Sequence, residues 1–379
     1  MSGTTDLPLA GIRVLDLTGE LGRYPGRVLA DLGADVVRVT TPGAGLARDA
    51  GPRVGPEQEK IGADFVFATI GQELVELDPD RAPDAARLES LLARADLLLT
   101  DDGPAALAAH GLDPAELAAR HPRLVHVAMS PYGLDGPYAD RPAGDLTLLA
   151  AGGLLQLAGT PDRAPVRPAG GQSGIATGLH ATVGALLGLL EREDSGAGQT
   201  VDVSAQQAVA HSLENAVQYA DLEGVVRGRT AGTATEVANG LFRCRDGWVY
   251  LVAGIGGTPL GWDGLVGWLS GAGVDVEVLR EPRWQDAAWR RTPAAADEFR
   301  RIFEAFTETR AKAELFEAGQ RHGVSLAPVA TPADLLASPQ LAARGFFREV
   351  EVAGRRVTVP GPPYRFAGLD VGPGRAPAA

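Results

Sequence analysis

The sequence is short of residues that commit a protein to particular kinds of chemistry. Its 379 residues include one cysteine, Cys244, which excludes an internal disulfide and any zinc or iron–sulfur site built from cysteines. We expect Cys244 to be a small buried hydrophobe. The 35 Lys and Arg are outnumbered by 48 Asp and Glu, and the net charge of −13 argues against nucleic acid or an anionic membrane as a partner.

Membrane and metal signals are also weak. No apolar run reaches the roughly 18 residues of a membrane span, and the opening "MSGTTDLPLAGIRVLDL" has no basic region followed by an apolar one. We therefore expect a soluble, cytoplasmic protein. We expect no metal site, because no two histidines have the i, i+3 or i+4 spacing beside a suitable carboxylate; they are His110, His121, His126, His180, His211 and His322.

The first part of the chain alternates between strand and helix patterns. A short apolar run at 11–17 leads into a glycine-rich turn, and "PGRVLADLGADVVRVT" follows as a helix ended by Gly33 and a second strand. Two later segments repeat a helical period followed by a continuous apolar strand. Continuous apolar strands are typical of a parallel sheet covered on both faces, so residues 1 to about 130 predict a doubly wound α/β domain.

The second part predicts a different organisation. Helical patterns dominate from 145 to about 224, apart from the strand-like "GQTVDVS". "GLFRCRDGWVYLVAG" then predicts two strands joined by a turn, with helices after them, and "FFREVEVAGRRVTVPGPPYRF" predicts a hairpin. We expect a large Rossmann-like domain at 1–225, a smaller α+β domain at 226–330 and a C-terminal segment at 331–379 that returns to the large domain.

The turn "TGELGRYPGR" at 18–27 lies where α/β folds bind ligands. Its glycines lack the G-x-G-x-x-G spacing, so it is not a dinucleotide fingerprint. Glu20, Arg23 and Tyr24 are unusually polar for such a turn. They are candidates for lining a site, and a solvated loop is the alternative.

A second candidate region is "RPAGGQSGIATGLHATVGALLGLLERE" at 167–193, a glycine-rich turn that runs into a long apolar helix. Ser173 is a possible nucleophile, although "GQSGI" is not a nucleophile elbow and an N-cap role fits the pattern better. His180 falls on the inner period of the helix, where it is either a satisfied core histidine or a general base.

Several motifs together resemble the family III CoA-transferases, the group that includes formyl-CoA transferase, carnitine CoA-transferase and 2-methylacyl-CoA racemase. They include "PLAGIRVLDLTGE", "RVLADLGADVVRV", "HPRLVHVAMSPYGLDGPYADRPAGDLTLLAAGGLLQLAGTP" and "VTVPGPPYRF", and they span almost the whole chain. The resemblance implies a Rossmann-like large domain containing both chain ends, a small domain and an interlocked dimer.

The same resemblance implies that the usual reacting groups are absent. In the transferases an aspartate near the start of the long helix attacks the acyl-CoA thioester and forms a mixed anhydride. Alignment without a gap places Gly174 there. The racemases use a histidine that precedes the aspartate matched by Asp145, and Gly144 takes its place; a glutamate of the small domain aligns near Gly256.

The positions that contact CoA in the family also differ. Where members have "VERPG", "NKRS" and "ENFRPG", this chain has "VTTPG", "TIGQEL" and "TDDGPA", so several basic residues are lost and Asp101 and Asp102 are expected to repel a phosphate. Arg38 lies nearby and is a candidate for compensating. Gln172 and Tyr132 complete the substrate-binding candidates. CoA or acyl-CoA binding stays an open question at this point, and no covalent cofactor is expected.

Three interpretations remain open from the sequence. The chain is a non-nucleophilic subunit whose aspartate comes from a paralogous chain, or an enzyme moved to dehydration, isomerisation, cyclisation or lysis on the same scaffold. In the third, a displaced carboxylate acts, with Asp145 the nearest candidate and a structural cap of the helix at Leu146 its default role. The expected partners are a small-molecule substrate and either a second copy or a paralogous chain.

Overall fold

The computed structural model describes residues 7–41, 51–55, 61–78, 81–230, 236–254 and 261–373. The chain divides into two compact units: the large unit takes in 1–156, 167–227 and 339–379, and the small unit takes in 157–166 and 228–338. Segment 157–166, which the sequence placed in the large domain, groups with the small unit, where Arg229 Nε donates to Thr160 O at 3.0 Å.

A parallel six-stranded sheet is the centre of the large unit, with the strand order β5-β2-β1-β6-β7-β8. The apolar runs of β6 and β7 are buried at every position, as expected for a sheet covered on both sides. The strands are β1 (Arg13–Asp16), β2 (Asp35–Thr40), β5 (Glu73–Glu76), β6 (Leu97–Thr100), β7 (Val125–Ser130) and β8 (Thr200–Ser204).

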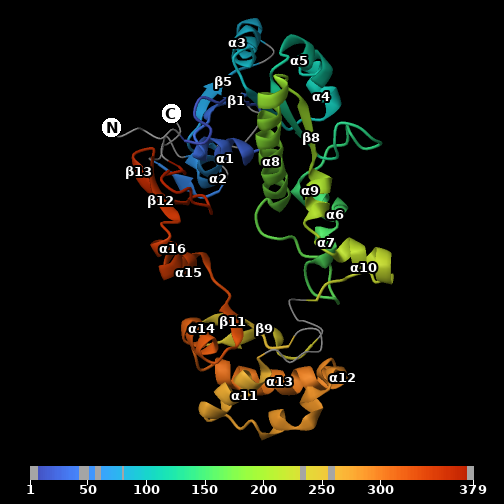
Figure 1. Ribbon diagram of the computed structural model, residues 1–379, viewed down its shortest axis with the longest axis vertical. Helices are drawn as coiled ribbons and strands as arrows, with labels where there is room; N and C mark the ends of the chain where they lie inside the picture. Colours follow the sequence, from blue (N-terminus) through green and yellow to red (C-terminus); the bar gives the residue numbers. More distant parts are fainter. Residues whose placement is uncertain are drawn as a thin grey trace. The chain divides into compact units, whose positions relative to one another are not determined.

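Helices cover both faces of this sheet (Figure 1). On one face lie α1 (Pro25–Asp31) and α8 (Gln172–Ser195), which form a core with alternate strand residues such as Val14 and Val127. On the other lie α3 (Ala82–Leu92), α4 (Pro104–Ala109) and α5 (Pro114–Arg120), against Leu15 and Leu98. The alternation follows from the two-residue period of a strand, and it confirms the predicted doubly wound fold.

Helix α8 is long and apolar enough to cross a membrane by length and composition, contrary to the expectation that no segment would be. Half of its most apolar stretch is buried inside the protein. Core helices of globular domains pass the same test, and Ala181 and Ala185 of α8 are fully buried against the sheet.

The large unit has further elements besides the sheet and the helices that cover it. The C-terminal hairpin of β12 (Phe347–Val352) and β13 (Arg355–Pro360) packs Val350, Val352 and Val359 against α2 (Ala63–Thr69). The other elements are β3 (Arg53–Val54), β4 (Ile61–Gly62), α6 (Asp145–Ala151), α7 (Leu154–Leu157), α9 (Ala205–His211), α10 (Ala216–Glu223) and α16 (Pro339–Ala343).

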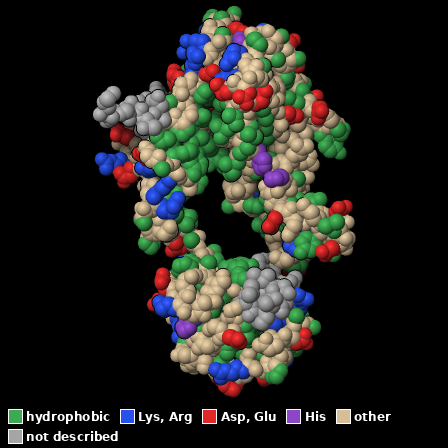
Figure 2. Space-filling view, in the orientation of Figure 1, with side chains coloured by type: hydrophobic (Ala, Val, Ile, Leu, Met, Phe, Trp, Pro, Cys, Tyr) green, Lys and Arg blue, Asp and Glu red, His purple; other side chains and the backbone are tan. Residues whose placement is uncertain are grey.

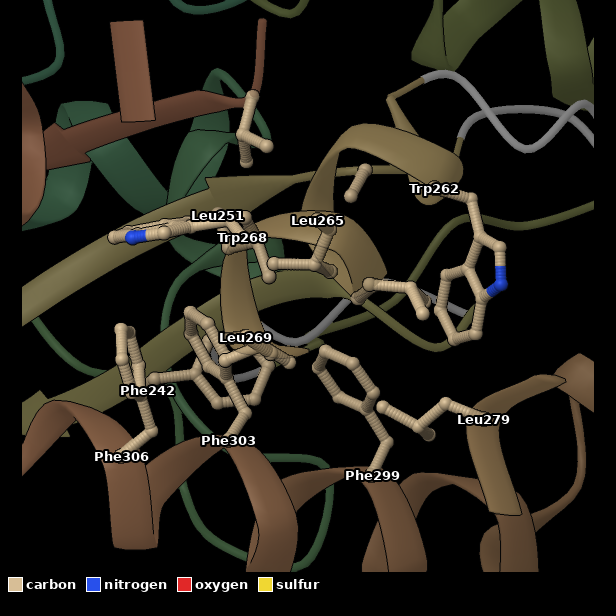
Figure 3. Close-up of a cluster of buried hydrophobic side chains, with 14 of the residues drawn as sticks. Phe242, Leu251, Trp262, Leu265, Trp268, Leu269, Leu279, Phe299, Phe303 and Phe306 are labelled. Carbon is tan, nitrogen blue, oxygen red and sulfur yellow. The ribbon is translucent and has the colours of Figure 1, made fainter. Parts of the chain in front are cut away.

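The small unit has an antiparallel sheet of order β11-β10-β9 and an aromatic core (Figure 3). Its strands are β9 (Asn239–Cys244), β10 (Gly247–Val252) and β11 (Ser325–Pro328). Its helices are α11 (Trp262–Gly271), α12 (Ala287–Arg290), α13 (Pro293–Thr307), α14 (Lys312–Arg321) and α15 (Pro332–Leu336), with 3-10 turns η1 (Glu277–Arg280) and η2 (Pro282–Gln285). Cys244 is buried in this core as expected, and burial raises the pKa of its thiol.

Candidate functional site

Four segments of the large unit line a cavity of about 460 Å³. They are the turn between β1 and α1, the start of α2, the start of α6 and the glycine-rich turn that leads into α8. The cavity thus brings together five candidates that the sequence proposed separately, and its walls include Glu20, Arg23, Asp145, Ser173 and Gly174.

Asp145 fixes the beginning of α8. One carboxylate oxygen accepts hydrogen bonds from the Ser173 backbone N–H at 3.0 Å and the Ser173 hydroxyl at 2.8 Å, and the other pairs with Arg167 Nε at 2.9 Å. Both oxygens are therefore engaged in holding the helix N-terminus, where a negative charge is favourable.

This geometry corrects two predictions. Ser173 is not an N-cap, because α8 begins at Gln172 and its N-cap residue, Gly171, forms no side-chain cap. Asp145 is not the cap of its own helix, because it lies in the first turn of α6 behind Gly144 and caps α8 instead. The sequence pattern identified Asp145 and Ser173 as polar residues at helix starts. It did not show that Asp145 of α6 accepts the hydrogen bonds of Ser173 in α8.

Gly174 lies on the cavity wall beside the β1–α1 turn. A Cβ atom built on it would meet the carbonyl oxygens of Leu21 at 3.3 Å and Glu20 at 3.4 Å, which is tighter than most side chains accept. The position where the resemblance places the nucleophile is therefore directly at the cavity, and it has no reacting group.

The β1–α1 turn is held together by groups of the chain itself. Arg38, from β2, is fully buried; its guanidinium pairs with Asp16 at 2.8 Å and donates to the carbonyl oxygen of Thr18. The geometry does not support the prediction that Arg38 contacts a ligand. Its guanidinium donates to groups of the turn, and the residue does not line the cavity.

Asp101 occupies the backbone donors of the same turn. Its two carboxylate oxygens accept from the N–H groups of Gly19 and Gly22, each at 2.8 Å. Burial raises the pKa of Asp101 to about 6, and the two amide hydrogen bonds oppose the rise. Backbone N–H groups that converge on one point bind a negative charge, and here that charge is a carboxylate of the protein itself.

His180 is placed differently from its prediction. It is exposed on the outer side of α8, where Nδ1 lies 2.9 Å from the Ala176 carbonyl oxygen and Nε2 lies 3.3 Å from His211 Nδ1. It is neither a core histidine nor close enough to line the cavity. The helical period placed it correctly on the helix, but it did not show which side of α8 is covered.

The remaining candidates lie at or beyond the cavity edge. Glu20 and Arg23 form an ion pair at 3.3 Å on its rim. Tyr24 stacks on Phe67 at 5.9 Å and burial raises its pKa, while exposed Gln172 donates to the Ala169 carbonyl oxygen at 2.8 Å. Tyr132 packs edge-on against Tyr138, 5.8 Å away.

Two cavity residues were missed, and one candidate is outside the described chain. Arg167 and Asp64 line the cavity although the sequence did not single them out; the signal for Arg167 was a basic residue just ahead of the glycine-rich turn. Gly256 lies outside the described residues. Within the described ranges, no three His, Cys, Asp or Glu side chains are grouped so as to hold a metal ion.

The parallel sheet with helices on both faces, and a cavity beside the turn that follows β1, define a doubly wound α/β protein of the kind that binds small molecules at its strand ends. More particularly, the chain belongs to CoA-transferase family III, whose family model matches residues 9–379.

Known proteins of this family match from 65% to 99% of the chain. The succinyl-CoA:(R)-benzylsuccinate CoA-transferase subunit BbsE of Thauera aromatica is 38% identical, over 94% of this chain and 88% of its own length. The succinyl-CoA–L-malate CoA-transferase beta subunit of Chloroflexus aurantiacus is 33% identical over 65% and 62%. The crystal structure of a CAIB/BAIF family protein from Brucella suis superposes with a TM-score of 0.88 at 26% identity, covering 99% of this chain and 96% of that protein.

Proposed function

We propose that this chain is the non-nucleophilic subunit of a heteromeric acyl-CoA transferase. The observation that carries the proposal is Gly174, a residue without a reacting group on the wall of a cavity whose frame is intact. The frame around it, the Asp145 carboxylate bound to Ser173 and Arg167, is complete. The covalent step therefore needs a carboxylate from another chain.

The relatives support a heteromeric assembly. BbsE and the malate CoA-transferase beta subunit are both named as subunits of CoA-transferases that use succinyl-CoA. We extend this to the present chain: the donor is succinyl-CoA, the acceptor is an organic acid with the character of a substituted succinate, and CoA takes part as a substrate without becoming a covalent cofactor of the protein.

The chemistry assigned to the assembly follows the family mechanism. The aspartate of a paralogous subunit attacks the thioester carbonyl, the CoA thiolate leaves, and a mixed anhydride forms on the protein. The acceptor carboxylate attacks this anhydride and releases succinate, and CoA thiolate then attacks the new anhydride, which regenerates the aspartate. This chain contributes the folded counterpart that the nucleophilic subunit needs.

The test is to express this chain alone, its aspartate-bearing paralogue alone, and both together, and to measure CoA transfer from succinyl-CoA to a panel of dicarboxylic acids. We expect transfer only from the pair. Hydroxylamine should trap an activated aspartyl group on the paralogue and none on this chain. Full activity of the paralogue alone, or a trapped group on this chain, would contradict the proposal.

Isothermal titration with CoA distinguishes the proposed subunit from the main alternative, an enzyme that has moved to a different reaction. The assembled pair should bind CoA, whereas an enzyme moved to dehydration, isomerisation, cyclisation or lysis need not bind it. If neither this chain nor the pair binds CoA at moderate salt, the scaffold serves a different substrate and the subunit assignment is wrong.

A further inference from the structure

Two exposed histidines lie side by side on the large unit. His180 belongs to α8, and His211 is the last residue of α9. Their rings meet edge to face, with centroids 5.1 Å apart and an interplanar angle of 88°. Figure 2 shows histidine side chains together at the surface in the region of α8 and α9. The two residues are 31 positions apart in the sequence, so a search for i, i+3 and i+4 spacings cannot find the pair.

The hydrogen bonds of the pair determine which nitrogen atoms can bind an ion. His180 Nδ1 lies 2.9 Å from the Ala176 carbonyl oxygen, and a carbonyl oxygen only accepts, so Nδ1 carries the proton. In the neutral ring the lone pair is therefore on Nε2, which faces His211 Nδ1 at 3.3 Å. Histidines that bind metals usually donate their other ring N–H to a carbonyl or carboxylate oxygen, because this bond fixes the tautomer and the orientation of the ring.

The separation of the two facing nitrogen atoms fits tetrahedral coordination. Zinc–nitrogen bonds are about 2.0–2.1 Å long, and two ligands at the tetrahedral angle then lie about 3.3–3.4 Å apart. Adjacent ligands of a square-planar ion with bonds of the same length would lie about 2.9 Å apart. The 3.3 Å between His180 Nε2 and His211 Nδ1 matches the tetrahedral value.

We propose that His180 and His211 form a binding site for a zinc ion. The ion takes the place of the hydrogen bond between the rings: the proton of His211 moves from Nδ1 to Nε2, its other neutral tautomer, and each facing nitrogen donates its lone pair to the ion. Water fills the remaining positions, because no third His, Cys, Asp or Glu among the described residues joins the pair. The net charge of −13 favours a cation at the surface.

The site is tested by isothermal titration of Zn²⁺ into the full chain, prepared without a histidine tag and freed of metal with a chelator. We expect one ion per chain. His180→Ala and His211→Ala should each raise the dissociation constant at least about tenfold, because each removes one of two protein ligands. The matched control is His110→Ala, an exposed histidine that ends α4 on the opposite face of the sheet; it should keep the constant within about twofold.

Two further measurements report the geometry and the folded state. Co²⁺ in place of Zn²⁺ should give the strong visible absorption of a tetrahedral site in the native chain and lose it in the double variant His180→Ala with His211→Ala. Without metal the native chain and the double variant should unfold at about the same temperature, because both side chains are exposed. Added Zn²⁺ should raise the Tm of the native chain alone.

The outcomes decide the proposal without reference to the subunit assignment. No binding by the native chain up to about 1 mM Zn²⁺ would overturn the site. Equal affinity of the native chain and the folded double variant would also overturn it, because the ion would then have other ligands. A bound Co²⁺ with only the weak absorption of octahedral coordination would overturn the tetrahedral geometry on which the site rests. None of these results changes the transfer assay of the proposed function.

Discussion

The Gly174→Asp variant tests whether a reacting group is all that the cavity lacks. We expect this variant, on its own, to gain no CoA transfer from succinyl-CoA. The N–H groups of Gly19 and Gly22 in the neighbouring turn are bound by Asp101, and the buried Arg38 is paired with Asp16, so these donors are engaged within the protein and are not free to bind an acyl-CoA. A carboxylate alone is a weak nucleophile unless the substrate is positioned beside it.

The stability effect of Gly174→Asp can be worked out from the local geometry. The new Cβ would lie 3.3 and 3.4 Å from two carbonyl oxygens, so the turn must shift by a few tenths of an ångström, a form of overpacking that costs about 1–3 kcal/mol. Replacing a glycine inside a helix stabilises the protein by about 0.5 kcal/mol. An acidic side chain in the first turn of α8 stabilises it by about 0.5 kcal/mol more. We expect a net loss of about 1 kcal/mol, or a Tm lower by about 2–4 °C.

Gly174→Ala and Gly174→Asn are the controls, since the first adds only the Cβ and the second adds the shape of aspartate without its charge. Activity is followed by release of free CoA in a single turnover, and stability by thermal unfolding. A burst of CoA release from Gly174→Asp that is absent from Gly174→Asn would refute the claim that the turn is closed to the substrate. A loss above about 3 kcal/mol in Gly174→Ala would refute the geometry itself.

Three further predictions concern the frame of the protein. Asp145→Ala should lower the unfolding free energy by about 1–2 kcal/mol, because α8 loses its cap, and Asp145→Asn, which keeps an acceptor for Ser173, should lose less in the same thermal assay. Arg290→Met removes the buried partner 2.9 Å from Glu236 in the small unit and should lower the unfolding free energy by about 3–5 kcal/mol, read from tryptophan fluorescence in denaturant; a loss below about 1 kcal/mol would contradict it. Because burial raises the pKa of Asp101 from 3.8 to about 6, the native chain should lose about 2 kcal/mol relative to Asp101→Asn as pH rises from 4 to 7, measured by urea unfolding at each pH. Burial lowers the pKa of His126 to about 4, so this histidine makes the protein more stable as pH rises over the same range. The measurement is therefore the difference in unfolding free energy between the native chain and Asp101→Asn at each pH, because the native chain alone shows both effects together.

The order of strands and helices was predictable because it depends on patterns within short windows. Continuous apolar runs identified β6 and β7, and a helical period identified α8 after a glycine-rich turn. In the structure Gly196, with φ 74°, ends this helix. The cavity was also anticipated in part, since polar residues at the end of β1 and the start of α8 lie at strand and helix ends that an α/β fold brings together.

The partners of individual side chains were not predictable in the same way. Asp101 was expected to repel a phosphate, yet it binds the N–H groups of Gly19 and Gly22, which lie 82 and 79 residues away in the sequence. This contact exists only because β1 and β6 are neighbours in the sheet, with Asp16 opposite Leu99. The prediction for His180 was wrong for a related reason. A helical period shows which residues share one side of a helix, but it does not show which side packs against the sheet.

The contacts around Gly174 explain how the cavity keeps its shape without a side chain at this position. Asp145 binds Ser173 and Arg167, and Asp101 binds the turn opposite, so both walls are held by carboxylates whose bonds are internal to the fold. Neither wall depends on a side chain at position 174, since the glycine contributes only backbone there. The frame of the cavity is therefore complete without a side chain at position 174.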